Sequence, residues 1–146
     1  MKCEEDIIEL ATTKMAEAEC LLNNRMPDGA YYLAGYCVEL VLKARICKMR
    51  GIPDFFDFDS ESKKKLKNEA NITRPYKVHD LEQLMLLAGL SSQFEIALQD
   101  DDFKDSWAII SKWNENVRYE TGQKTTQVQL FVTSIKELMA WIQKYL

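Results

Sequence analysis

Five side chains of this sequence have the types needed for acid–base or phosphate chemistry: Glu39, Lys43, His79, Arg118 and Tyr119. Glutamate and histidine transfer protons, whereas arginine, lysine and tyrosine hold phosphate oxygens or aromatic rings. They come from three separate segments, so only a fold that joins these segments brings them together. In that case we expect Glu39 and Arg118 to neutralise each other between helices. The set then forms either a polar groove for a phosphate-bearing ligand or a structural ion-pair network.

Two of these residues belong to the stretch 28–45, DGAYYLAGYCVELVLKAR, which we expect to be a buried helix. At about 100° per residue, apolar side chains cover most of the circumference and leave one polar line. Glu39 and Lys43 in this line are four residues apart, so they can pair with each other. Alternatively, the line faces a groove between helices. The predicted groove residues are Tyr32, Tyr36, Glu39, Lys43, Asn114 and Arg118.

Several kinds of site are not expected from the residues present. His79 is the only histidine, no nucleophile stands at a suitable spacing from it, and its position before a helix favours a structural contact. The four cysteines form no CxxC pair, which disfavours zinc. The aspartates at 100–102 lack a calcium-binding loop and more simply start a helix. Because glycine-rich phosphate loops are also absent, we expect neither a metal nor a cofactor.

The composition favours one domain spanning residues 1–146. This length builds a single sizeable core, and the net charge of −4 argues against nonspecific attraction of nucleic acid over the whole surface. Cysteines without a disulfide pattern indicate the cytoplasm. No stretch approaches the roughly 18 apolar residues of a membrane span, and no membrane association is expected. The lysine run at 63–67 is typical of a solvated surface, although it has the charge to contact phosphates.

Helical periodicity and capping signals define the expected elements. Helices are predicted over 5–23 and 28–50, followed by an irregular connection over 52–78. Asp80 with Gln83 caps a short helix that Gly89 ends, and 91–98 adds one or two turns. The next helix is expected to run from Asp100 to about Arg118. Thr126 with Gln129 is predicted to cap the last helix, whose apolar side chains continue to position 145. This order predicts an all-α fold, an antiparallel up-and-down four-helix bundle with additional short helices.

Three segments in this order resemble the HEPN domains. They are Ala30–Ala44 (AYYLAGYCVELVLKA), the KVHDL sequence that contains His79, and VRY, which contains Arg118 and Tyr119. The resemblance implies a helical bundle that forms homodimers and acts in nucleotide or RNA chemistry. It also implies a small nucleotidyltransferase as partner, as in toxin–antitoxin or related defence systems.

Ribonucleases of the HEPN family carry an arginine followed, after four to six residues, by a histidine. Arg118 matches the arginine, but the following residues 119–125, YETGQKT, contain no histidine. Without that imidazole, a proton transfer worth ~10²–10⁴ in rate lacks an evident group. We therefore expect a noncatalytic binding module. The alternatives are a divergent metal-independent ribonuclease that uses Arg118 and Tyr119, with His79 as a further candidate, and a purely structural interaction domain.

Overall fold

A computed structural model describes residues 4–51 and 79–146; Cys3 and the predicted connection over 52–78, with its lysine run, lie outside the described residues. All secondary structure in these two ranges is helical, as the sequence predicts, although the element boundaries differ in places. The elements are α1 (Glu4–Asn23), α2 (Pro27–Arg50), α4 (Leu81–Leu87), α5 (Ser91–Ala97), α6 (Asp101–Ile110), the 3₁₀ helix η2 (Glu115–Tyr119) and α7 (Thr125–Gln143).

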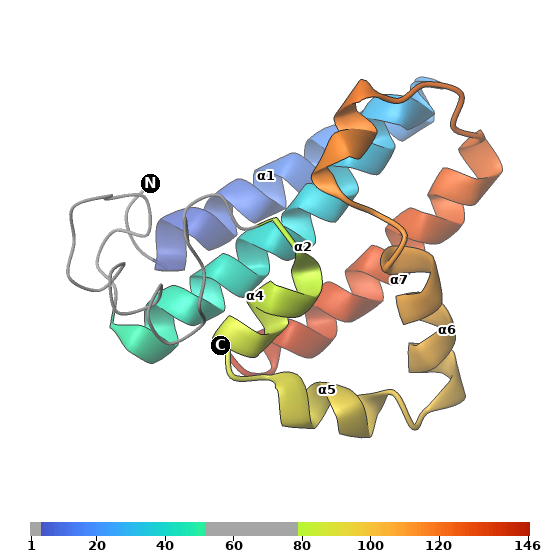
Figure 1. Cartoon of the computed structure of the whole chain (residues 1–146). Coiled ribbons are helices and arrows are strands. Elements are labelled where there is room, and N and C mark those ends of the chain that lie inside the picture. Colours follow the sequence, from blue (N-terminus) through green and yellow to red (C-terminus); the bar gives the residue numbers. More distant parts are fainter. Residues whose placement is uncertain (1–3, 52–78) are drawn as a thin grey trace.

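The first two helices form the expected antiparallel hairpin (Figure 1). The loop between them is tight because the Met26 N–H donates to the Leu21 carbonyl at 2.8 Å and Arg25 adopts a left-handed backbone conformation. Pro27 then occupies the first turn of α2, where its missing N–H costs no helical hydrogen bond. At the other end, Gly51 has φ +62° and donates to the Cys47 carbonyl, which closes α2 as glycine commonly does.

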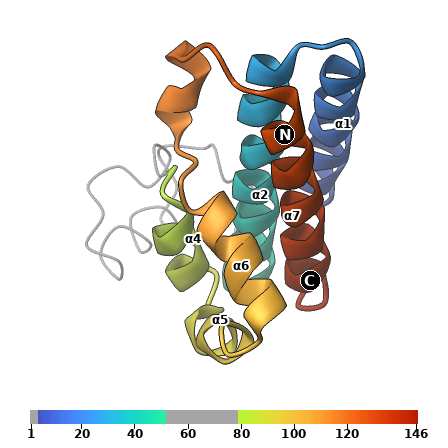
Figure 2. The ribbon, with the colours of Figure 1, turned by 90° about the vertical axis from the view of Figure 1, so that its right-hand side faces the viewer.

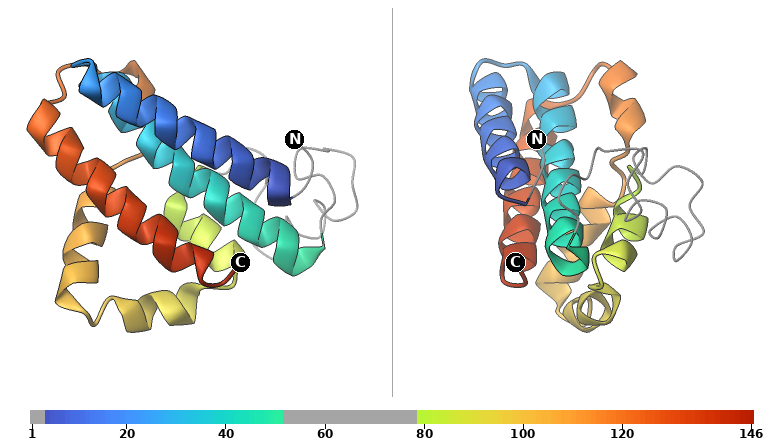
Figure 3. Two further views of the ribbon diagram at one scale, coloured as in Figure 1. Left: turned by 180° about the vertical axis from the view of Figure 1, so that it is seen from behind. Right: turned by 90° about the vertical axis from the view of Figure 1, so that its left-hand side faces the viewer.

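Helix α2 lies at the centre of the structure. It packs against α1, α4, η2 and α7, and thirteen of its residues are buried. Helices α1 and α4 lie on opposite sides of it (Figure 2), and α7 runs in the same direction as α2 while α1 runs in the opposite one (Figure 3). The buried apolar side chains of all these helices belong to one hydrophobic cluster. Any polar side chain on the middle of α2 must therefore find its partners within the protein.

The chain from α4 to α6 wraps around α2 and α7 in short segments. The predicted cap of α4 is confirmed, since the Gln83 N–H donates to a carboxylate oxygen of Asp80 at 3.1 Å. Gly89, with φ +70°, follows the end of α4. The acidic cluster starts α6 as expected, with Asp100 accepting a hydrogen bond from the Asp102 N–H. Helix α6 then packs against α7.

The predicted helix from Asp100 to Arg118 is wrong in its second half, because α6 already ends at Ile110. The reason is Asn114, whose extended backbone and side-chain bond to the Asn116 N–H start η2 instead. Asparagine competes with helical hydrogen bonds in this way. The described residues therefore contain three long helices, α1, α2 and α7, and the finer arrangement of four long antiparallel helices is not confirmed.

The predicted cap of the last helix is also wrong. Helix α7 begins at Thr125, and the residue before it, Lys124, makes no side-chain cap. The loop that leads into α7 is held instead from a distance, by the carboxylate of Asp28 at the start of α2. An aspartate in the first turn of a helix is well placed for this contact, but nothing in the local sequence around Thr126 reveals it.

Candidate functional site

The polar line on α2 exists as predicted, and its second half holds charges that pair with each other. Lys43 Nζ lies 2.5 Å from Glu39 Oε1, and His79 Nδ1 lies 2.8 Å from the same oxygen. The other ring nitrogen of His79 lies 3.1 Å from Glu115 Oε2. The side chains of Glu39 and Lys43 are 1% and 3% exposed. We call Glu39, Lys43, His79 and Glu115 the buried ion cluster.

The contacts of His79 engage both of its ring nitrogens. One nitrogen faces a carboxylate oxygen of Glu39, and the other faces a carboxylate oxygen of Glu115. The side chains of His79 and Glu115 are partly exposed, whereas Glu39 and Lys43 are buried. The buried carboxylate and ammonium lie within hydrogen-bond distance of each other, as a desolvated site requires.

The first half of the polar line has a different character. The guanidinium of Arg118 lies 4.9 Å from the centre of the Tyr119 ring, and the Tyr32 hydroxyl is a further polar neighbour. The Tyr32 hydroxyl, with the contribution of Tyr119, raises the pKa of Arg118 above its ordinary value because these groups favour the charged form. Arg118 is exposed to solvent, and Tyr119 is 74% exposed. We call Arg118, Tyr119 and Tyr32 the arginine–tyrosine surface.

Tyr36 connects the two halves of the line. Its ring stacks on that of Tyr32 at 6.1 Å with an angle of 4° between the planes. Burial raises the pKa of the Tyr36 hydroxyl, and the carboxylate of Glu39 raises it further. The hydroxyl of Tyr36 therefore stays protonated. Its neutral side chain lies between Glu39 of the buried ion cluster and the ring of Tyr32.

Trp113 closes the structure over this part of α2. A methyl group on Gly35 would lie only 2.2 Å from Cε2 of Trp113, so the indole rests directly on the helix backbone. The Trp113 ring also stacks on Tyr32 at 6.3 Å and is 4% exposed. Its buried N–H has no hydrogen-bond partner in the described part of the chain. This unpaired donor indicates that shape, rather than polar bonding, fixes the ring here.

The predicted contact between Glu39 and Arg118 is wrong. Glu39 pairs with Lys43 and His79, whereas Arg118 lies beside Tyr32, and Tyr32 is seven positions before Glu39 on α2. At about 1.5 Å per residue, this separation is roughly 10 Å along the helix axis. His79 is held at Glu39 and Arg118 at Tyr32, so these contacts do not place the two side chains at one reacting atom.

Asn114, the remaining predicted groove residue, starts η2 and lines a cavity of ≈ 320 Å³ beside His79. Trp107 and Trp113 form apolar walls of this cavity, and Asp80 lies at its edge. Sequence reasoning missed Glu115, the second partner of His79. Asn114 was the sequence signal that could have revealed this contact. As an N-cap it starts η2 at Glu115, and the side chain of Glu115 then reaches His79, just before α4.

A metal site is not formed by the described residues, since no three histidine, cysteine, aspartate or glutamate side chains among them gather closely enough to hold an ion. Of the cysteines in residues 4–51, Cys20 is exposed, and Cys37 and Cys47 are buried; all three are free thiols. None of the helices described is both long and apolar enough to span a bilayer.

The sequence matches no protein-family model, and comparisons with curated proteins and with solved structures gave no match. The functional argument therefore depends on the residues and geometry of this chain.

Proposed function

We propose that this chain is a noncatalytic, HEPN-like helical module that binds single-stranded RNA or a nucleotide through the arginine–tyrosine surface. The observation that carries the proposal is the environment of Arg118. Its guanidinium is exposed and lies over an exposed tyrosine ring, and no carboxylate pairs with it among the residues described. Lys43 in the buried ion cluster is paired with a carboxylate, whereas Arg118 is not paired with one among the described residues. This difference supports the binding of an anionic ligand by Arg118.

The chemistry of the arginine–tyrosine surface suits RNA. Single strands are held by cations that contact phosphates and by aromatic rings on which bases stack. Arg118 supplies a planar cation, and Tyr119 supplies an accessible ring beside it. The guanidinium already lies over the Tyr119 ring in the unbound structure, which reduces the ordering cost of binding.

The absence of catalysis in this proposal is supported by the position of His79. Both of its ring nitrogens are engaged by carboxylates, so neither is available to take or give a proton on a substrate. Tyr119 is adjacent to Arg118, but a tyrosine hydroxyl is a weak base near neutral pH. Neither His79 nor Tyr119 thus supplies the proton transfer that the ribonuclease alternative requires.

The proposal extends to the partners that the HEPN resemblance implies. We propose a cytoplasmic homodimer of up-and-down helical bundles that associates with a small nucleotidyltransferase in a toxin–antitoxin or defence-type system. Light scattering after gel filtration tests the dimer, and co-purification with a nucleotidyltransferase encoded by the adjacent reading frame tests the partner. A monomer at micromolar concentration, or a neighbouring enzyme that does not co-purify, contradicts the respective part.

RNA binding is tested by the fluorescence anisotropy of a labelled single-stranded oligonucleotide at low salt. We expect Arg118→Ala to weaken binding about tenfold and Tyr119→Ala to weaken it by a similar factor, since a charge-assisted hydrogen bond and a stacked base are each worth about 1–3 kcal/mol. Lys144→Ala, which removes one exposed charge after the end of α7, is the control. Equal losses in Arg118→Ala and Lys144→Ala would indicate nonspecific attraction and contradict the proposal.

The same RNA incubated with the protein in EDTA tests the ribonuclease alternative. The proposed function predicts intact RNA. Cleavage that persists in EDTA and disappears in Arg118→Ala would establish the alternative and overturn the noncatalytic assignment.

A further inference from the structure

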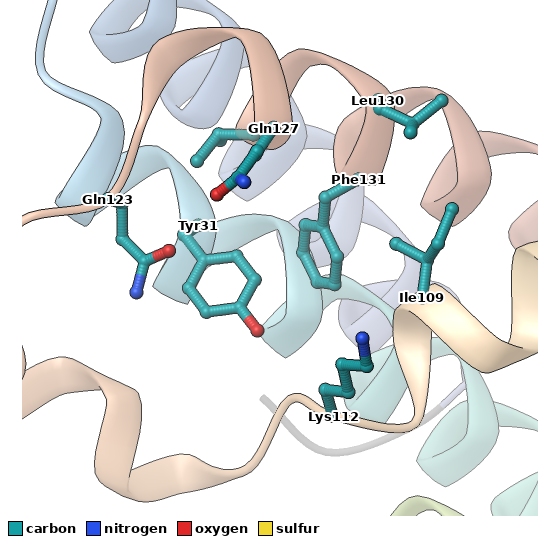
Figure 4. A pocket seen from close by; sticks show the side chains of 8 residues that line it. Tyr31, Ile109, Lys112, Gln123, Gln127, Leu130 and Phe131 are labelled. Carbon is teal, nitrogen blue, oxygen red and sulfur yellow. The ribbon is translucent and has the colours of Figure 1, made fainter.

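A cavity of ≈ 310 Å³ lies on another side of α2, among α2, the end of α6 and the start of α7 (Figure 4). It shares no residue with the arginine–tyrosine surface or the buried ion cluster. Its volume is at the lower limit of small-molecule sites, which suits a ligand with a single ring system. The side chains used in the argument are Tyr31, Ile109, Lys112, Gln123, Gln127 and Phe131.

The apolar part of this cavity is aromatic. The rings of Tyr31 and Phe131 meet edge to face, with their centres 4.4 Å apart and 63° between their planes. Phe131 is 2% exposed and is part of the core, so it is a fixed wall. Ile109 from α6 contributes an aliphatic side chain opposite these rings (Figure 4). Such walls favour a flat ring, which gains stacking and edge-to-face contacts that a chain-like ligand does not make.

The polar part consists of two amides, a hydroxyl and one ammonium. The hydroxyl of Tyr31 and the amine of Lys112 point toward the same side of the cavity, and Gln123 and Gln127 flank the Tyr31 ring (Figure 4). Each amide offers both a donor and an acceptor, which suits the edge of a heteroaromatic ring. No carboxylate lines the cavity within the described residues. Glu120 is the acidic group that acts on Tyr31, whose pKa is raised first by burial and then by this charge.

One of these amides is held by a contact outside the cavity. The Gln123 N–H donates to Asp28 Oδ1 at 2.8 Å, and the Gly122 N–H donates to Asp28 Oδ2 at 3.3 Å. Gly122 has φ +88°, a conformation that glycine adopts without strain. The first turn of α2 thereby fixes the loop that carries Gln123. A loop fixed before binding loses less entropy when a ligand arrives.

We propose that this cavity binds a small heteroaromatic anion, a flat ring with hydrogen-bonding edges that carries a phosphate or a carboxylate. The ring lies against Tyr31 and Phe131, the two glutamines bind its edge, and Lys112 binds the acidic group. This inference goes beyond the function proposed above and does not depend on it, because Arg118 takes no part in the cavity.

Isothermal titration calorimetry with adenosine monophosphate and with nicotinate distinguishes the two anionic groups. Adenosine and nicotinamide are the neutral counterparts, and inorganic phosphate tests the anion without a ring. We expect at least one of the two acids to bind about tenfold more tightly than its neutral counterpart, which corresponds to one charge-assisted contact. Inorganic phosphate alone is expected to bind weakly or not at all.

Two pairs of matched variants locate the binding. Lys112→Gln is expected to abolish the preference for the acid, whereas Lys104→Gln, an exposed change on α6 outside the cavity, leaves it intact. Gln127→Ala is expected to weaken binding, whereas Gln129→Ala, also exposed on α7, does not. Arg118→Ala is expected to leave the Lys112-dependent binding unchanged, even where a nucleotide also binds at the arginine–tyrosine surface. Lys112 and Gln127 line the cavity, whereas the control positions Lys104, Gln129 and Arg118 do not. Circular dichroism tests whether each variant is folded.

Three results would overturn the inference: no heat of binding from either acid, equal affinities for the acids and their neutral counterparts, or equal losses in Lys112→Gln and Lys104→Gln. Loss of the Lys112-dependent binding in Arg118→Ala would also overturn it, because the acid would then occupy the arginine–tyrosine surface alone. If RNA binding fails its own test while an acid binds here, only the proposed function is lost.

Discussion

The two halves of the polar line on α2 place similar side chains in opposite situations. In the buried ion cluster, the charge of Lys43 is within hydrogen-bond distance of Glu39, and both are almost inaccessible to solvent. In the arginine–tyrosine surface, the charge of Arg118 is exposed and its neighbours are tyrosines. One face of α2 thus meets a buried ion pair at Glu39 and Lys43 and, about two turns away at Tyr32, an accessible cation from η2.

The comparison shows that residue type alone does not assign a role to a charge. A desolvated ion requires an opposite charge nearby, so its first effect is on stability. An exposed cation stacked on an aromatic ring contributes little to stability and remains available to an anion. Burial and partners therefore separate the candidate residues of this chain into a buried group expected to act on stability and an exposed group that we propose binds an anion.

Breaking the buried ion cluster has the largest expected effect. Glu39→Gln removes the negative charge next to Lys43 and His79, and we expect the free energy of unfolding to fall by about 3 kcal/mol. Urea denaturation followed by circular dichroism measures the change. Glu17→Gln is the control, since it removes the partner of Lys14 in an exposed pair and should cost less than about 0.5 kcal/mol. Similar losses in the two variants would contradict the assignment.

The contact between Trp113 and Gly35 lies between Tyr32 and Glu39 along α2, and disturbing it has the next largest effect. Gly35→Ala places a methyl group in the indole ring, and we expect a loss of about 2 kcal/mol even though alanine favours a helix. The tryptophan emission should shift as Trp113 moves. Gly29→Ala is a matched change in the same helix, where the added methyl meets only the end of Leu21 at 3.0 Å. A loss as large at Gly29 would mean that contact with Trp113 is not the cause.

The enclosed side of α2 also contains Cys37, which provides a test by pH. Burial raises the pKa of its thiol to about 12, and its single S–H has the carbonyl oxygens of Leu33 at 3.2 Å and Ala11 at 3.4 Å as acceptors. The unfolded thiol ionises first as pH rises above about 9, so the folded state loses relative stability, by about 1 kcal/mol at pH 10. Unfolding in urea at pH 8 and pH 10 measures this loss. It should be smaller in Cys37→Ala, and an unchanged loss there would assign it to other groups such as Tyr36.

The smallest expected effect on stability comes from the arginine–tyrosine surface. Arg118→Ala should change the free energy of unfolding by less than about 0.5 kcal/mol, because the side chain is exposed and its partners remain hydrated without it. The urea transition of the purified variant gives the value. A loss above 1 kcal/mol would place Arg118 with the structural residues and weaken the comparison.

The sequence predicts the long helices and the polar line well because both follow from local periodicity. The antiparallel pair of α1 and α2, the Asp80 cap and the stripe from Tyr32 to Lys43 are all encoded by residues close together in the chain. The HEPN assignment, its partners and its ligands stay predictions, since no comparison tests them.

The sequence does not predict which residues contact the polar line, because these contacts depend on where α6 ends. A continuous helix from Asp100 to Arg118 would direct Glu115 and Arg118 differently from the observed turn at Asn114. The capping strength of a single asparagine decides between these two paths, and its competition with helix propensity is worth only about 1 kcal/mol. The contact of Asp28 with the loop before α7 is likewise a tertiary bond between residues 94 and 95 positions apart.

A crossed measurement of RNA affinity and unfolding free energy in Glu39→Gln and Arg118→Ala tests the central claim most directly. Both variants are compared with the unchanged protein at a temperature where circular dichroism shows them folded. We predict that Arg118→Ala weakens RNA binding about tenfold without loss of stability, and that Glu39→Gln loses about 3 kcal/mol of stability while its folded form keeps its RNA affinity. Loss of RNA affinity in Glu39→Gln equal to that in Arg118→Ala would contradict the division of the polar line into a structural half and a binding half.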